Sequence, residues 1–132
     1  MVNEIVVDTN FILTCVKQKI QMFEEFEELF GIYELAVGKQ VLNELNKLND
    51  EKELKMKDRE ASAVALKLLK HKKIKTIEFM APSVDSGIVF YALKKPGIII
   101  ATLDRELKNR IKKNNKTAKF LTIKQKKKIV WD

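Results

Sequence analysis

Two aspartates stand where an apolar run is expected to give way to a helix. Asp8 follows the β-branched residues 5–7, and Asp104 closely follows the apolar run 97–101. Runs that are apolar on both faces are typical of central parallel strands covered by helices on both sides. The working cleft of an open α/β sheet lies off the carboxyl ends of such strands. If the two strands are neighbours, the two carboxylates lie side by side in that cleft.

Two further acids break the apolar pattern of their own segments. At about 100° per residue, Asp85 falls in the middle of the apolar stripe of the helix expected after Pro82. Glu44 lies at the margin of the stripe that contains Val41 and Leu45. Each acid stands near the start of its helix, at the end that faces the cleft. Because burial of a lone carboxylate is costly, a shared cation would explain these positions.

Helix capping is the competing explanation for each acid taken singly, because short polar side chains at helix starts satisfy free backbone amides. Asp8 or Asn10 would cap the first helix in this way. Ser83 or Asp85 would cap the helix expected after Pro82, and Asp104 would cap the next one. Capping does not account for Glu44, which lies inside its helix. Four carboxylates together form the oxygen-rich ligand set that Mg²⁺ or Mn²⁺ prefers, and such an ion activates water and neutralises charge on a phosphate.

The elements that would position these acids alternate along the chain. Helical spacing is expected to continue from Phe11 to Phe30 and end at Gly31. A polar loop or frayed connection is expected over residues 49–58. Strands are predicted at residues 4–8, 33–37, 74–79, 97–101 and 120–123, with an additional edge strand at 129–131. The alternation predicts an α/β fold, a three-layer α/β/α sandwich around a mostly parallel sheet of about five strands.

Length and composition indicate one domain over residues 1–132, since 15.3 kDa with 45% hydrophobic residues suffices for one core. The single Cys15 forms neither an intramolecular disulfide nor a cysteine-based zinc site, which favours a reducing compartment. No apolar run reaches the roughly 18 residues of a membrane span, and Glu4 interrupts any signal peptide. We therefore expect a soluble, cytoplasmic protein without membrane contact.

The basic charge is concentrated in the C-terminal segment 105–132. This segment holds 11 Lys and Arg against 2 Asp and Glu, whereas residues 1–104 hold 15 against 16. A patch of this kind indicates a polyanionic partner such as nucleic acid. A solvated surface that keeps the protein soluble is an equally good explanation of the charge alone.

Four motifs follow one another along the chain: Val7-Asp8-Thr9-Asn10, Val41-Leu42-Asn43-Glu44-Leu45, Val84-Asp85-Ser86-Gly87-Ile88 and Ala101-Thr102-Leu103-Asp104-Arg105-Glu106-Leu107. In this order they resemble the PIN domain family of metal-dependent endoribonucleases, over nearly the whole chain. The stretches 8–12 and 101–108 look most like the branch that includes the ribosomal-RNA processing factors of archaea and eukaryotes.

The resemblance implies a role for each motif residue. Asn10 and Thr102 would orient the metal-binding acids or the phosphate. Ser86 departs from the pattern, because that branch often has a second acid at this place. Its hydroxyl can bond to water or phosphate but is a poor metal ligand, which bears on whether one or two Mg²⁺ or Mn²⁺ ions are held. The implied catalytic and metal-binding acids are Asp8, Glu44, Asp85 and Asp104.

Basic residues near and beyond the fourth motif are the expected contacts to RNA phosphates, which carry no sequence selectivity. Trp131 could stack on a base, but packing of an edge strand is favoured. His71 is expected in a basic, solvated loop. The phenylalanines at 23, 26 and 30 indicate core or a homodimer face. The expected RNA-binding residues are Arg105, Lys108, Lys124, Lys126, Lys127 and Lys128.

Two alternatives to a processing endoribonuclease of ribosomal precursor particles stay open. One is a toxin-type RNase held by a small antitoxin partner. The other is an inactive scaffold that binds RNA or assembly factors through its lysines. A nucleotide-binding module is disfavoured, because the turn after the first strand lacks the glycines that let a phosphate approach the backbone.

Overall fold

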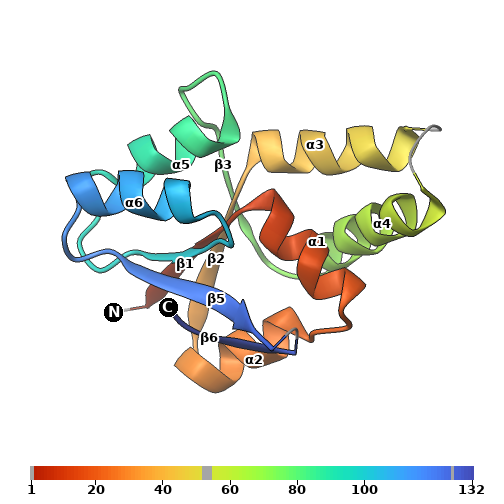
Figure 1. Ribbon diagram of the computed structural model, residues 1–132, viewed down its shortest axis with the longest axis horizontal. Helices are drawn as coiled ribbons and strands as arrows, with labels where there is room; N and C mark the ends of the chain where they lie inside the picture. The colour runs from red at the N-terminus through yellow and green to blue at the C-terminus, as the bar shows by residue number, and fades with distance from the viewer. Residues whose placement is uncertain (1, 52–54, 126) are drawn as a thin grey trace.

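The computed structural model describes residues 2–51, 55–125 and 127–132. Within them, six strands form one sheet in the order β3-β2-β1-β4-β5-β6 (Figure 1). β1 to β5 run parallel, and β6 pairs with β5 in the antiparallel direction. The predicted additional edge strand is therefore present. The strands are β1 (Asn3–Val7), β2 (Tyr33–Gly38), β3 (Lys75–Ile77), β4 (Ile99–Ala101), β5 (Lys119–Lys124) and β6 (Lys128–Trp131).

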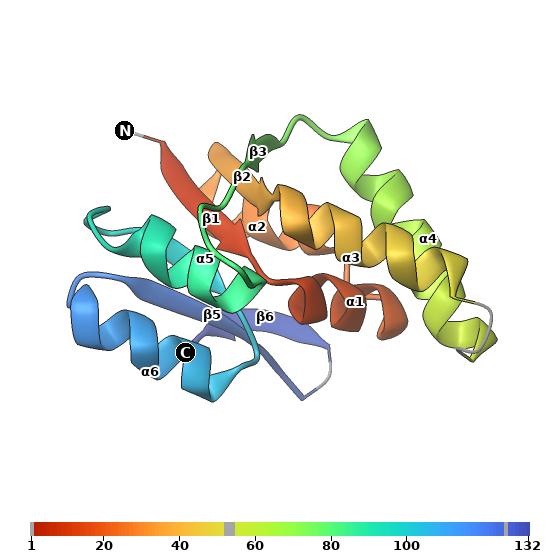
Figure 2. The same ribbon diagram turned by 90° about the horizontal axis from the view of Figure 1, so that it is seen from above.

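Helices cover both faces of this sheet, which confirms the predicted three-layer α/β architecture. Figures 1 and 2 show α5 and α6 side by side on one face and α2 on the other. α4 packs against both α1 and α3. The helices are α1 (Thr9–Lys17), α2 (Met22–Phe30), α3 (Lys39–Asp50), α4 (Met56–His71), α5 (Val84–Ala92) and α6 (Arg105–Asn114).

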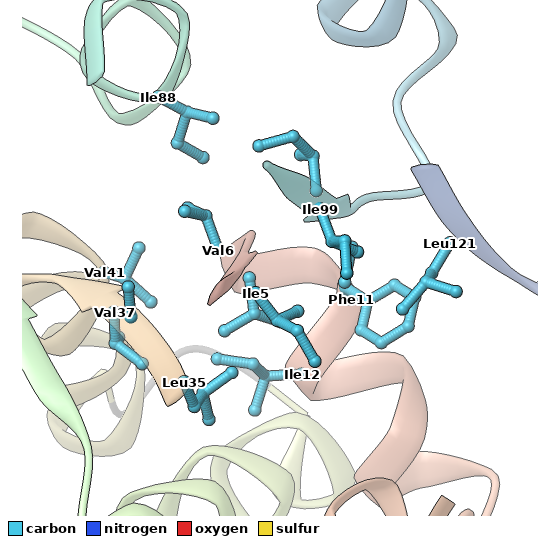
Figure 3. Packing of buried hydrophobic residues seen from close by; sticks show 14 of the residues in the cluster. Ile5, Val6, Phe11, Ile12, Leu35, Val37, Val41, Ile88, Ile99 and Leu121 are labelled. Carbon is cyan, nitrogen blue, oxygen red and sulfur yellow. The ribbon is translucent and has the colours of Figure 1, made fainter. Parts of the chain in front are cut away.

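The two most apolar strands, β1 and β4, are neighbours at the centre of the sheet, as their sequences predicted. Val6 lies opposite Ile100 in the parallel register, and the apolar residues of both strands are buried. In Figure 3, Val6 points toward Ile88 of α5, whereas Ile5 lies among side chains from the other layer. Burial on both faces explains why these strands lack a polar alternation. It also brings their carboxyl ends together.

The expectation of one continuous helix from Phe11 to Phe30 is wrong. α1 ends at Lys17, and Lys19 adopts a left-handed backbone with φ of 58°. The amide of Ile20 donates to the carbonyl of Cys15 over 2.8 Å, which closes the turn. The apolar spacing continues through this turn without a glycine or proline, so periodicity alone did not reveal the break.

The connection between α3 and α4 is shorter than predicted. α3 continues to Asp50 and α4 begins at Met56, before the expected start at Arg59. Residues 52–54 of the expected loop lie outside the described residues. None of the helices in the described ranges is long and apolar enough to cross a membrane.

Side chains of α2 contact the edge strand β6. The carboxylate of Glu25 accepts a hydrogen bond from the amide of Ile129 over 2.7 Å. The ring of Trp131 packs edge-on against Phe30, with 5.4 Å between ring centroids. Phe23 and Phe26 are buried in the core. The preference for packing over base stacking at Trp131 agrees with this contact, although the ring stays 48% exposed.

Candidate active site

A hollow of about 340 Å³ lies off the carboxyl ends of β1 and β4, at the starts of α1, α5 and α6. The structure brings all four predicted acids to this one hollow, although they come from segments far apart in the chain. Asn10 also lines it. The lining residues are Asp8, Thr9, Asn10, Leu13, Glu44, Leu48, Val84, Asp85 and Asp104.

Asp8 is the most buried of the four acids, with 8% of its surface exposed. One carboxylate oxygen, Oδ1, accepts a hydrogen bond from the amide of Thr9 over 2.8 Å. The other, Oδ2, accepts one from the hydroxyl of Thr102 over 3.1 Å. Burial raises the pKa of Asp8 to about 6 against the opposing effect of the Thr102 hydrogen bond, and the charges of Asp85 and Asp104 add to the rise.

Thr102 links the two aspartates that end the central strands. Its Oγ1 accepts a hydrogen bond from the amide of Asp104 over 3.1 Å while donating to Asp8. Oδ1 of Asp104 in turn caps α6, accepting from the amides of Glu106 and Leu107 at 2.9 and 3.2 Å. Asp104 can therefore cap α6 and still belong to the acid cluster, because its capping bonds use only one of its two oxygens.

Asp85 does not cap its helix. Ser83 does so, since its Oγ accepts a hydrogen bond from the amide of Ser86 over 3.2 Å. Asp85 is half-buried, and burial, followed by the charge of Asp104, raises its pKa. The charge of Arg110 on α6 opposes this rise. The cation Arg110 thus lies near the acids, whereas the sequence had indicated a cluster of carboxylates without a Lys or Arg among them.

Phe79, in the loop between β3 and α5, holds two of the helices that line the hollow. Its ring packs against Gly38 at the start of α3 and against Gly87 in α5, where a Cβ on either glycine would overlap the phenylalanine. Gln40 of α3 also donates to the carbonyl of Ala81 in the same loop over 3.0 Å. These contacts fix the separation of the helices that carry Glu44 and Asp85. Sequence reasoning missed Phe79, although Gly87 inside an apolar stripe was a signal of close approach.

A family model described as PIN like domain matches residues 5–126. The chain belongs to the PIN-like domain family. This confirms the resemblance drawn from the four motifs. Ribonuclease VapC4 of Methanocaldococcus jannaschii is 34% identical over 113 residues, which cover 85% of each chain. The solved structure of the PIN domain endonuclease Utp24 matches 98% of this chain and 90% of its own, with a TM-score of 0.78 and 25% identity. Both relatives are nucleases.

The donor set of this PIN-like domain suits a hard divalent cation. Carboxylate oxygens are what Mg²⁺ and Mn²⁺ prefer, and mutual repulsion contributes to the raised pKa of Asp8. Among the described residues, however, no three His, Cys, Asp or Glu side chains already stand close enough together to hold an ion. Glu44 is exposed at the rim of the hollow, whereas Asp8 is fixed at its base by Thr9 and Thr102. The four acids therefore fit a divalent ion, because they offer carboxylate oxygens and because they line the same hollow.

The expected RNA-binding residues of this PIN-like domain come from two parts of the fold, the start of α6 and the segment where β5 gives way to β6. Arg105 is exposed next to Asp104, but Nζ of Lys108 pairs with the carboxylate of Asp132 over 2.7 Å and is largely covered. In Figure 1 the end of β5 and the start of β6 lie in the lower part of the molecule, below α5 and α6. Lys126 lies outside the described residues. The exposed lysines in this segment are Lys124, Lys127 and Lys128.

Proposed function

We propose that this PIN-like domain is a metal-dependent endoribonuclease that hydrolyses phosphodiester bonds in structured RNA. The observation that carries the proposal is the hollow that Asp8, Glu44, Asp85 and Asp104 line together. The ribonuclease and the endonuclease among its relatives support the same reaction.

The chain's own residues would hold the reacting groups in place. Asp8 is fixed through both carboxylate oxygens, and Asp104 is fixed through its helix cap, so neither needs to reorganise when a ligand arrives. Asn10 is exposed in the lining and would contact a phosphate oxygen of the bound RNA. One or two Mg²⁺ or Mn²⁺ ions held by the carboxylates would supply an activated water and neutralise the charge of the phosphate.

The motif resemblance is our reason to propose ribosomal precursor RNA as the substrate and precursor particles as the partner. The toxin-type alternative differs in requiring a small antitoxin that inhibits cleavage. Co-purification of the endogenous protein separates the two, because recovery of ribosomal precursors favours processing and recovery of a small inhibitory protein favours the toxin.

The direct test is cleavage of labelled, structured RNA with Mn²⁺ or Mg²⁺ by the wild-type protein and by Asp8→Asn and Asp104→Asn. We expect cleavage by the wild type that chelation abolishes, with a loss of at least about 100-fold in either variant because each removes a charged metal ligand. Equal cleavage by all three proteins would contradict the proposal. RNA binding without any cleavage would instead identify an inactive scaffold.

A further inference from the structure

Arg110 lies beside the acidic hollow through its contact with Ser86. Nη2 of Arg110 on α6 donates to Oγ of Ser86 on α5 over 3.4 Å, a long hydrogen bond between two helices that Figures 1 and 2 show side by side. Ser86 directly follows Asp85, which lines the hollow. The guanidinium therefore stands at the edge of the proposed metal site and is not itself part of its lining.

The guanidinium keeps its charge unpaired among the described residues. Glu106 lies four residues earlier on the same helix, an arrangement that favours an ion pair on an isolated helix. No such pair forms within 4.0 Å in the described part of the chain, and the guanidinium bonds to the neutral Ser86 instead. An acid in place of Ser86 would have neutralised it. A neutral hydroxyl leaves the charge available to a ligand.

The other basic residues that begin α6 are placed differently. Lys108 is held by Asp132 and lies over the ring of Phe120, so its charge is already compensated. Arg105 is exposed beside Asp104. Arg110 alone among these three contacts α5 through a side-chain hydrogen bond within the described residues. A planar guanidinium with several N–H groups binds phosphate oxygens in pairs, which a lysine ammonium does not.

We infer that Arg110 is a phosphate-binding residue that holds an RNA phosphate at the edge of the acidic hollow, with Ser86 as its neighbour. An RNA strand approaching four carboxylates meets repulsion, and a cation at the rim offsets that repulsion. The phosphate would replace the long Ser86 bond with shorter, charge-assisted ones. This inference rests on the proposed function, because it assumes that RNA is the substrate.

The test measures RNA binding in EDTA, so that neither metal nor cleavage contributes. Fluorescence anisotropy with a labelled, structured RNA compares the wild type with Arg110→Ala, Arg110→Lys and the control Lys70→Ala, an exposed cation on α4. We expect Arg110→Ala to weaken binding by about 5- to 20-fold and to reduce the slope of log affinity against log salt by about 1. Arg110→Lys should keep the slope but lose part of the affinity. Lys70→Ala should match the wild type.

Equal binding by the wild type and Arg110→Ala would overturn this inference and leave the proposed function standing. The same would follow if Lys70→Ala lost as much affinity as Arg110→Ala, because the effect would then be one of overall charge. Failure of the wild-type protein to bind RNA in EDTA would also overturn this inference, whereas the proposed function would fail only if cleavage with Mn²⁺ or Mg²⁺ were absent. Because Arg110 is exposed, its variants should unfold at the wild-type temperature, which a thermal melt confirms before binding is measured.

Discussion

The hydroxyl of Thr102 donates a hydrogen bond to Oδ2 of Asp8 and accepts one from the amide of Asp104, both over 3.1 Å. One side chain therefore sets the orientation of the two aspartates that end the central strands. Such outer contacts fix metal ligands in place, and their loss lowers metal affinity by about 10- to 100-fold.

Thr102→Val should consequently weaken Mn²⁺ binding by about 10-fold or more, because it removes the hydroxyl while keeping the shape of the side chain. Thr102→Ser keeps the hydroxyl and is the matched control, expected to bind Mn²⁺ nearly as the wild type does. Isothermal titration calorimetry measures both. Equal affinity of the Val variant and the wild type would show that Asp8 needs no such support.

The raised pKa of Asp8 predicts a pH-dependent loss of stability in the metal-free protein. The pKa is 3.8 in the unfolded reference and about 6 in the fold. Between these values the folded protein binds more protons than the unfolded chain, so the contribution of Asp8 to stability falls as pH rises from about 4 to about 6. Asp8→Asn removes this contribution.

Urea unfolding in EDTA measures the free energy of unfolding of both proteins. As the pH rises through this window, that of Asp8→Asn should increase by about 3 kcal/mol relative to that of the wild type. The gain should be complete above about pH 6, where Asp8 of the wild type is ionised. Curves that stay parallel from pH 4 to pH 7 would contradict a raised pKa for Asp8.

Metal binding should stabilise the fold, because an ion held by the folded carboxylates shifts the unfolding equilibrium by mass action. Mn²⁺ at about 100 times its dissociation constant should raise the free energy of unfolding by about 2.7 kcal/mol. Asp85→Asn should lose most of this gain, whereas Glu78→Gln, an exposed acid outside the hollow, should keep it. Thermal melts with and without Mn²⁺ measure the difference. A similar gain in Asp85→Asn and in the wild type would place the ion elsewhere.

The contact between Phe79 and Gly38 predicts that Phe79→Leu partly reverses the destabilisation caused by Gly38→Ala. Gly38 has a φ of −66°, which alanine adopts without strain, so the cost of Gly38→Ala comes from overlap with the Phe79 ring. We expect a loss of about 1–3 kcal/mol of unfolding free energy. Phe79→Leu removes the two ring atoms that would overlap most, Cε2 and Cζ, and should make the double variant more stable than the sum of the single effects by about 1 kcal/mol.

Gly87→Ala is the matched control for this cycle. Its Cβ would overlap Cβ and Cγ of Phe79, which leucine retains, so Phe79→Leu should not suppress it. Chemical denaturation of the five variants measures the free energies. Additive effects in the Gly38 pair would show that the ring does not hold the start of α3.

The sequence was sufficient to predict the parts of the fold that depend on burial. β1 and β4 lack a polar face, and only neighbouring central positions bury both of their faces. Their carboxyl ends then bring Asp8 and Asp104 to one edge of the sheet. Asp85 lies on the apolar stripe of its helix, and this placement likewise indicated a metal site. The positions of Asp8, Asp85 and Asp104 could all be predicted because each follows from the periodicity of its own segment.

Features that depend on how separate elements meet were not predictable from the sequence. The break at Lys19 interrupts no apolar spacing, and the position of Phe79 follows from the distance between α3 and α5. The contact of Arg110 with Ser86 depends on how α6 packs beside α5. The pairing of Lys108 with Asp132 joins α6 to residues beyond β6. For Phe79, Arg110 and Lys108 the contact lies in another element of the chain, where no pattern within one segment reveals it.

The hollow that the four carboxylates line is predicted to bind a metal ion. A crystal structure with Mn²⁺, analysed by anomalous diffraction, tests it most directly. We predict a peak in the hollow, about 2.0–2.3 Å from oxygens of Asp8 and at least one of Glu44, Asp85 and Asp104. A structure saturated with Mn²⁺ that shows no peak there, or a peak bound only by surface acids outside the hollow, would contradict the account.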